Sequence, residues 1–118
     1  MRFMLMFRPE KAPPPGTHAC RADLPEMQSL IAELFASGIL ISTHGLKGSE
    51  SGARVRHSGG KMTVRDGPFA EARELIAGVC IVEVPSRDEA VALARRFLEI
   101  AGDAEGDILE ILPAPGAH

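Results

Sequence analysis

The residues of this 118-residue chain that are best suited to proton transfer are His44 and Asp66. His44 follows the apolar run Ile39–Ile41 and precedes a glycine-rich loop, a position from which a side chain can point into a cleft. An imidazole exchanges protons near neutral pH, so His44 is a candidate general base. The alternative is a partly exposed loop histidine without a catalytic role.

Asp66 also has two interpretations. It precedes Gly67 and Pro68 at the end of a predicted strand, where an aspartate commonly accepts hydrogen bonds from the amides of its own turn. As a functional residue it would instead orient or deprotonate a histidine, as carboxylates do in many acid–base sites. A His44–Asp66 pair of this kind would suit hydrolysis or elimination on a small carbonyl or carboxylate compound.

Charged residues around the same turn are candidates for substrate binding. The guanidinium groups of Arg65 and Arg73 have the fork geometry that matches a carboxylate, and Glu71 lies between them in the sequence. We expect these three residues to contact a small ligand. The alternative is a solvated charged loop, because exposed ion pairs contribute little to stability.

Composition and spacing exclude several classes of function. The net charge is −3 and the chain contains neither Trp nor Tyr, so it lacks the basic footprint and stacking platforms of a nucleic-acid-binding protein. Cys20 and Cys80 are too far apart for a metal motif, and Cys80 is expected to be a buried apolar residue. There is no phosphate loop or dinucleotide fingerprint. We therefore expect no metal, cofactor or nucleic-acid site and, because no apolar run could span a bilayer, a cytoplasmic protein.

The first half of the chain predicts a strand, a helix and a second strand. Residues 2–8 are apolar on both faces, as in a strand that is covered on both sides. A proline-rich loop follows at 11–21. Asp23 and Glu26 have the spacing of a capping box, which predicts a helix that stops at Gly38. Residues 39–41 open the second strand, which leads through His44 into the glycine loop.

The second half predicts a hairpin, a strand, a helix and a last strand. Residues 53–57 and 61–65 alternate apolar and polar side chains around the turn sequence Ser58-Gly59-Gly60. Residues 78–84 are apolar and β-branched, as in a central strand. Ser86 and Glu89 predict a helix start, Gly102 and Gly106 bracket a predicted turn, and 108–112 predict the final strand. We expect one domain over 1–118 with a loose tail at 113–118.

The segment from Asp66 to Gly78, DGPFAEARELIAG, resembles the DGPF signature of the YCII-related family, and 51–55 and 58–61 are similar to the same pattern. Ala72 and Arg73 stand where the family usually has Thr and Lys. The resemblance implies an α+β, ferredoxin-like βαβ–hairpin–βαβ fold, with two helices on one face of an antiparallel sheet, that pairs into a dimeric α/β barrel. Some relatives are thought to use a His–Asp pair whose histidine lies near the first helix, a region where this sequence offers only His18.

The predicted sheet leaves one face uncovered. The order of elements packs both helices on one face, and apolar residues from strands near Met4 and Val82 remain on the other. Such a face promotes aggregation when exposed, so we expect a homodimer that stacks the two sheets. The expected function is a small enzyme that uses His44 and Asp66. The alternative is a non-catalytic ligand-binding or regulatory homodimer in which the same turn shapes a pocket for a small molecule.

Overall fold

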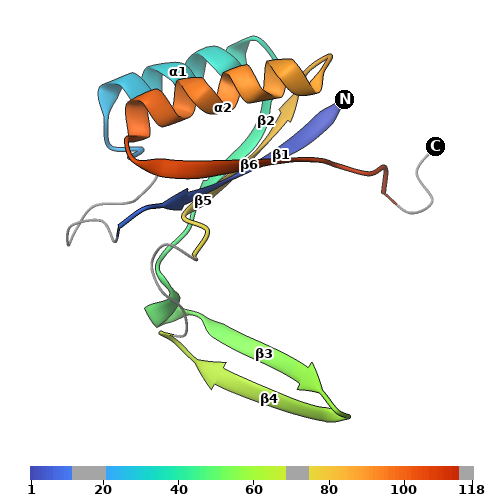
Figure 1. The fold of residues 1–118 in the computed structure, drawn as a ribbon. Helices are drawn as coiled ribbons and strands as arrows, with labels where there is room; N and C mark the ends of the chain where they lie inside the picture. The colour runs from blue at the N-terminus through green and yellow to red at the C-terminus, as the bar shows by residue number, and fades with distance from the viewer. Residues whose placement is uncertain (12–20, 69–74, 115–118) are drawn as a thin grey trace.

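The computed structural model describes residues 1–11, 21–68 and 75–114. Figure 1 shows two helices packed over a four-stranded sheet, with a separate two-stranded hairpin that projects from the sheet. The helices are α1 (Pro25–Ala36) and α2 (Arg87–Ala101), and a short 3-10 turn, η1, covers Ser49–Ser51. The strands are β1 (Arg2–Pro9), β2 (Leu40–Gly45), β3 (Ala53–Ser58), β4 (Lys61–Asp66), β5 (Gly78–Glu83) and β6 (Ala104–Glu110).

The order of strands in the main sheet is β2-β5-β1-β6, and every adjacent pair is antiparallel. Strands β1 and β5 are therefore central, which agrees with their nearly continuous apolar sequences. The predicted sequence of elements, β-α-β, hairpin, β-α-β, is confirmed. The chain is an α+β protein with two helices on one face of an antiparallel sheet, an architecture compatible with a ferredoxin-like fold.

The hydrophobic core lies between the helices and one face of the sheet. Leu5 and Val82 are fully buried there, and the rings of Phe7 and Phe97 pack at a tilt with centroids 5.7 Å apart. Burial of each large apolar side chain contributes about 1.5–3 kcal/mol before entropic costs. The core consists of Phe3, Leu5, Met27, Leu30, Leu34, Leu40, Cys80, Val82, Val84, Ala90, Leu93, Ala94 and Phe97.

The opposite face of the sheet, here called the open face, carries a second set of apolar residues. Side chains alternate along a strand and directly paired residues share a face, so the register assigns to this face Met4, Met6, Val79, Ile81 and Leu109. The prediction that apolar residues near Met4 lie there is confirmed. The strand of Val82 contributes Val79 and Ile81 to this face, while Val82 itself pairs with Phe3 and Leu40 beneath the helices.

Of the two predicted helix caps, the structure confirms one and contradicts the other. The predicted cap at Asp23 is wrong: the N-cap is Leu24, without a side-chain hydrogen bond, and the Asp23 carboxylate pairs with Arg21 at 3.3 Å. Pro25, with its fixed φ, occupies the start of the helix, so the helix begins without the capping box. At α2 the prediction is confirmed, because the Ser86 hydroxyl accepts a hydrogen bond from the Glu89 amide at 3.2 Å.

Strand β6 begins earlier than the sequence predicts. Gly106, expected to border a turn, lies inside the strand and pairs with Phe7. A side-chain carbon at Gly106 would lie 3.1 Å from Cε1 of Phe7, so the missing side chain makes room for the aromatic ring. The strand ends at Glu110 rather than at residue 112. Of the predicted tail, residues 115–118 lie outside the described residues.

The β3–β4 hairpin, residues 53–66, is here called the arm. Its predicted turn is confirmed, since Gly59 and Gly60 have φ of 59° and 77°, values that favour glycine. The prediction that only one face would be wet is wrong, because every residue of both strands is exposed. The Cα radius of gyration is 16.0 Å, compared with about 13.5 Å for a compact chain of this length. The arm accounts for this difference (Figure 1).

The base of the arm is held by close backbone packing at Gly67. Its amide donates a hydrogen bond to the carbonyl of Gly52 at 3.0 Å. A side-chain carbon at Gly67 would overlap the carbonyl oxygen of Ser49. A glycine is therefore needed at position 67 for η1 to pack this closely against it. The sequence alone predicts only that Gly67 permits a bend.

We expect Gly67→Ala to loosen the arm, because overlap with a backbone atom costs on the order of 1–3 kcal/mol. Amide hydrogen exchange should show the β3–β4 ladder exchanging about tenfold faster or more. The matched control is Gly48→Ala, whose added carbon would meet only the flexible carboxylate of Glu50. Equal exchange in the two variants would contradict this account.

Candidate functional site

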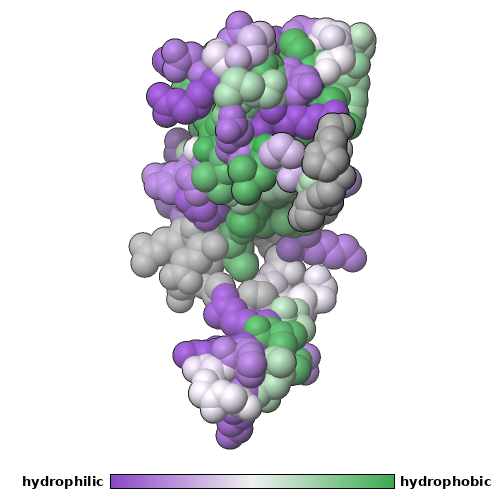
Figure 2. Space-filling model, turned by 90° about the vertical axis from the view of Figure 1, so that its right-hand side faces the viewer, coloured by the Kyte–Doolittle hydropathy of each residue, from purple (hydrophilic) through white to green (hydrophobic). Residues whose placement is uncertain are grey.

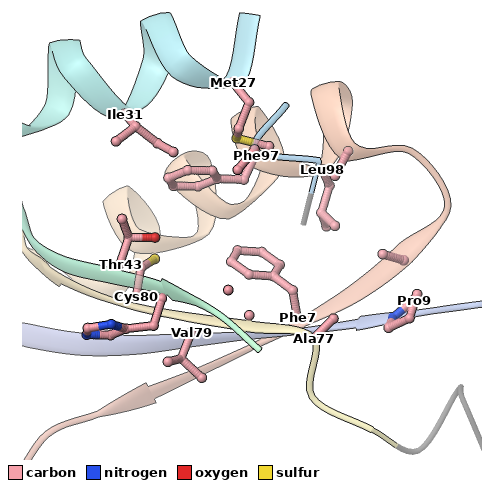
Figure 3. Close-up of a pocket in the computed structure, with 16 residues that line it drawn as sticks. Phe7, Pro9, Met27, Ile31, Thr43, Ala77, Val79, Cys80, Phe97 and Leu98 are labelled. Atoms are coloured by element: carbon pink, nitrogen blue, oxygen red, sulfur yellow. The ribbon is translucent and has the colours of Figure 1, made fainter. Parts of the chain in front are cut away.

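A cavity of about 250 Å³ lies between the helices and the end of the sheet where β1 and β2 finish and β5 begins (Figure 3). Segments from six elements, β1, α1, β2, β5, α2 and β6, and their adjoining loops meet there, because the antiparallel order brings these strand ends together. Its lining residues are Phe7, Pro9, Ala22, Met27, Ile31, Thr43, His44, Gly45, Ala77, Gly78, Val79, Cys80, Phe97, Leu98, Ala101 and Ala104.

Apolar side chains form most of this wall. Figure 3 shows the rings of Phe7 and Phe97 together with Met27, Ile31 and Leu98 around the cavity. Several lining positions are alanine or glycine, so the strand and helix ends leave a space that larger side chains would fill. The cavity is therefore large enough to hold a small ring compound, because an apolar cavity of about 150 Å³ already binds benzene.

The polar side chains on the cavity side of the sheet are those of Thr43 and Cys80, which pair across β2 and β5. Cys80 is buried, as the sequence predicts. Burial raises the pKa of its thiol from 9.0 to about 12, because the thiolate would lose its hydration. At neutral pH the group is therefore a neutral thiol and a weak hydrogen-bond donor, and it lacks the thiolate character of a nucleophile.

His44 borders the cavity, but its side chain belongs to the open face. It pairs with Val79, while its neighbour Thr43 pairs with Cys80. Figure 3 shows Val79 on the opposite side of the strands from Thr43 and Cys80, and residues that pair directly share a face. The imidazole is exposed, so its chemistry would take place outside the helix-covered cavity.

Asp66 and Arg65 lie on the arm. Asp66 pairs with Ala53, Arg65 pairs with Arg54, and all four residues are exposed. Within the described parts of the chain, no hydrogen bond or ion pair joins His44 to Asp66, and the two belong to different sheets. A catalytic pair formed by them therefore stays a prediction. The proposed ligand contacts Glu71 and Arg73 lie outside the described residues.

Apart from His44, sequence reasoning missed the residues that line the cavity as site residues, because helix and strand ends of Ala, Leu and Phe look like ordinary core. The one local signal is Thr43, a hydroxyl that sits between apolar strand residues and the glycine loop. Over residues 1–11, 21–68 and 75–114, no group of three or more His, Cys, Asp or Glu could hold a metal ion. In the same part of the chain, no helix is both long and apolar enough to cross a membrane.

The fold and the cavity define a two-layer α+β protein with an apolar pocket between its layers. Within that class the chain belongs to the YCII-related family, whose domain matches residues 1–105. An uncharacterized protein of Rhizobium meliloti (strain 1021) is 46% identical over 43 residues, which cover 36% of this chain and 35% of that protein. The match thus spans about a third of that relative's length.

A solved structure of similar fold is 5-chloro-2-hydroxyhydroquinone dehydrochlorinase (TftG) from Burkholderia phenoliruptrix AC1100, in complex with 2,5-dihydroxybenzoquinone. The TM-score is 0.54, the sequence identity is 12%, and the alignment covers 100% of both chains. At this identity the likeness concerns the fold alone.

The Cys80 thiol should resist alkylation in the folded protein. In a Cys20→Ser variant at pH 8, we expect iodoacetamide to label Cys80 at least about 100-fold more slowly than the same chain in urea, because only an accessible thiolate reacts. Mass spectrometry over time measures both rates. Labelling of the folded chain at the rate of a free thiol would show that Cys80 is neither buried nor held protonated.

Proposed function

We propose that this YCII-related protein binds a small, neutral, mostly apolar ring compound in the cavity between its helices and its sheet. The observation that carries the proposal is the cavity itself, about 250 Å³ in volume and lined largely by apolar side chains. Transfer of an apolar ring from water into such a site is favourable by roughly 25 cal/mol per Å² of buried apolar area. A charged ligand would lose its hydration without a compensating partner.

Specificity would come from the neutral donors Thr43 and Cys80. A hydroxyl and a thiol on adjacent strands can each hydrogen-bond a carbonyl or phenol oxygen, and such groups fix the orientation of a ligand in an otherwise apolar pocket. The compound in the TftG complex is a six-membered ring with oxygen substituents, which supports a ring compound as the ligand for the shared fold.

We expect phenol to perturb the methyl resonances of Met27 and Ile31 in carbon–proton NMR spectra, with saturation at a Kd on the order of 1 mM. Benzoate, a ring of similar size with a charge, should produce no saturable change at equal concentration. Ala101→Phe should abolish the phenol effect by filling the cavity, while Ala92→Phe on the exposed side of α2 should preserve it. Equal phenol responses in both variants would refute the pocket.

A second candidate function is proton transfer at the edge of the open face, with His44 as general base and Asp66, which lies on the arm, as the carboxylate that would have to approach and orient it. The base would take a proton from a small carbonyl or carboxylate compound, and a leaving group would depart with its bonding electrons, or water would be activated for hydrolysis. The name of TftG, a dehydrochlorinase, supports elimination as a reaction for this fold. Arg65, Arg73 and Glu71 are the proposed contacts for the substrate.

Screening with small esters and chlorinated phenols should reveal turnover if this second function holds. His44→Ala should then lower kcat by about 10²–10⁴-fold, and Asp66→Asn should lower it as well. The melting temperatures should stay within a few degrees, because both side chains are exposed. Unchanged turnover in both variants would end this proposal and leave the non-catalytic binding protein.

The proposed assembly is a homodimer in the cytoplasm. The apolar open face supports pairing, since Leu109 is 58% exposed in the single chain. The YCII resemblance implies that two sheets close over one another as a dimeric α/β barrel. In that arrangement the open face, with His44 at its edge, would border a space between the two copies.

A further inference from the structure

The arm is an amphipathic ribbon whose apolar face is exposed and has no cover among the residues that the structure describes. The register places Val55 opposite Val64 and His57 opposite Met62 on one face, and Arg54 opposite Arg65 on the other. Val55, Met62 and Val64 are 63%, 61% and 67% exposed. Figure 2 shows hydrophobic side chains gathered along one side of the arm and hydrophilic side chains along the other.

An isolated two-stranded hairpin with this pattern needs a partner surface. Two strands without a third strand or a packed helix are at best marginally stable in water, and an apolar ribbon edge is prone to unwanted association. The turn glycines and the close packing at Gly67 nevertheless build the arm as a defined structure. A surface that covers the face of Val55, Met62 and Val64 would account for both features.

We propose that this apolar face docks on a second copy of the chain, against the open face of its four-stranded sheet. The proposal rests on the homodimer proposed above and adds the surface that the arm contributes to it. Both surfaces are apolar and uncovered by residues 1–11, 21–68 and 75–114 of the same chain, so one contact would remove both from water. A two-fold axis would make the contact reciprocal, with each arm seated on the other sheet.

Charge favours the second copy as the occupant. The arm carries Arg54, Arg56, Lys61 and Arg65 against Asp66, a net charge of +3, while the whole chain has −3, so the remainder of the chain carries −6. Net charge thus draws the arm of one copy toward the body of another, while the register places the four basic side chains on the face of the arm that points away from the proposed contact. On the open face the carboxylates of Glu83, Glu105 and Asp107 already pair with Arg2 and Arg8, so net charge acts on the encounter of two copies and not through new ion pairs in the contact. Attraction of this kind acts over roughly 8 Å at physiological salt and speeds encounter.

The size of the arm sets how much it can contribute. One face of a six-residue, two-stranded ribbon measures about 20 by 10 Å, or about 200 Å². Two arms and the surfaces that they cover would bury about 800 Å² in total, whereas a stable interface typically buries about 1,200–2,000 Å². The arms therefore supplement contacts between the sheets and do not form the whole interface.

The first test is sedimentation of the full chain with a charge placed on either face of β4. We expect the wild type at micromolar concentration to have twice the 12.6 kDa chain mass. Val64→Asp should raise the dimer dissociation constant by about 30-fold or more, as loss of a central contact does. The matched control, Thr63→Asp, adds the same charge one residue away on the basic face and should change that constant by less than about threefold.

The outcomes separate the two proposals. A wild-type monomer at all concentrations would overturn both the homodimer and the docking of the arm. A dimer that tolerates Val64→Asp, or that is weakened equally by Thr63→Asp, would overturn arm docking alone and leave a dimer of stacked sheets.

A disulfide test covers the case in which Val64→Asp unfolds the arm. In a Cys20→Ser background, chains with Val64→Cys and chains with Leu109→Cys are mixed and mildly oxidised. We expect a cross-link between the two different chains, because both residues lie on the proposed contact surfaces. A mixture of Thr63→Cys and Leu109→Cys chains should give at least about tenfold less cross-linked product, because the side chain at position 63 points away from the proposed contact. Equal yields from the two mixtures would overturn the proposal.

Discussion

The constraint on which the rest of this structure depends is the division of one antiparallel sheet into a side beneath two helices and a side that no described helix or strand covers. Because side chains alternate along each strand, the register alone decides where every residue acts. Leu5 and Cys80 pair within the core, while Met4 and Ile81, one position away, pair on the open face. A shift of one residue would exchange the two sets and remove the core.

The same division separates two kinds of chemistry. The helix-covered side holds a neutral, apolar cavity in which Cys80 keeps its proton, an environment suited to retaining a ring compound. The open side carries the exposed imidazole of His44. The proposed binding and the proposed proton transfer would therefore take place on opposite surfaces of one sheet. A ligand held under the helices would be separated from that imidazole by the sheet.

Local sequence patterns predicted the elements well, because the information that defines them is local. The turn at Gly59 and Gly60 and the Ser86 cap depend on a few adjacent residues and match the structure. The errors arise where distant segments decide. Gly106 resembles a turn residue until β1 pairs alongside it, and Val82 can be assigned to a side only when its partners are known.

The candidate site was less predictable for the same reason. The cavity is formed by strand and helix ends that are far apart in the sequence. From the sequence alone, its lining residues cannot be distinguished from core residues. The separation of His44 from Asp66 follows from the projection of the arm, which no local pattern encodes. The sequence predicts which residue types are available for chemistry. Whether these residues lie close together depends on the three-dimensional arrangement of the chain.

The glycine inside β6 also links the sheet edge to the shape of the pocket. Phe7 and Leu98 both line the cavity, and both lie within van der Waals reach of a carbon added at Gly106, at 3.1 Å and 3.7 Å. A larger residue at this position would require the Phe7 ring to shift, and because Phe7 lines the cavity, the shape of the cavity would change with it. The cavity is thus shaped in part by a residue that is not among those lining it.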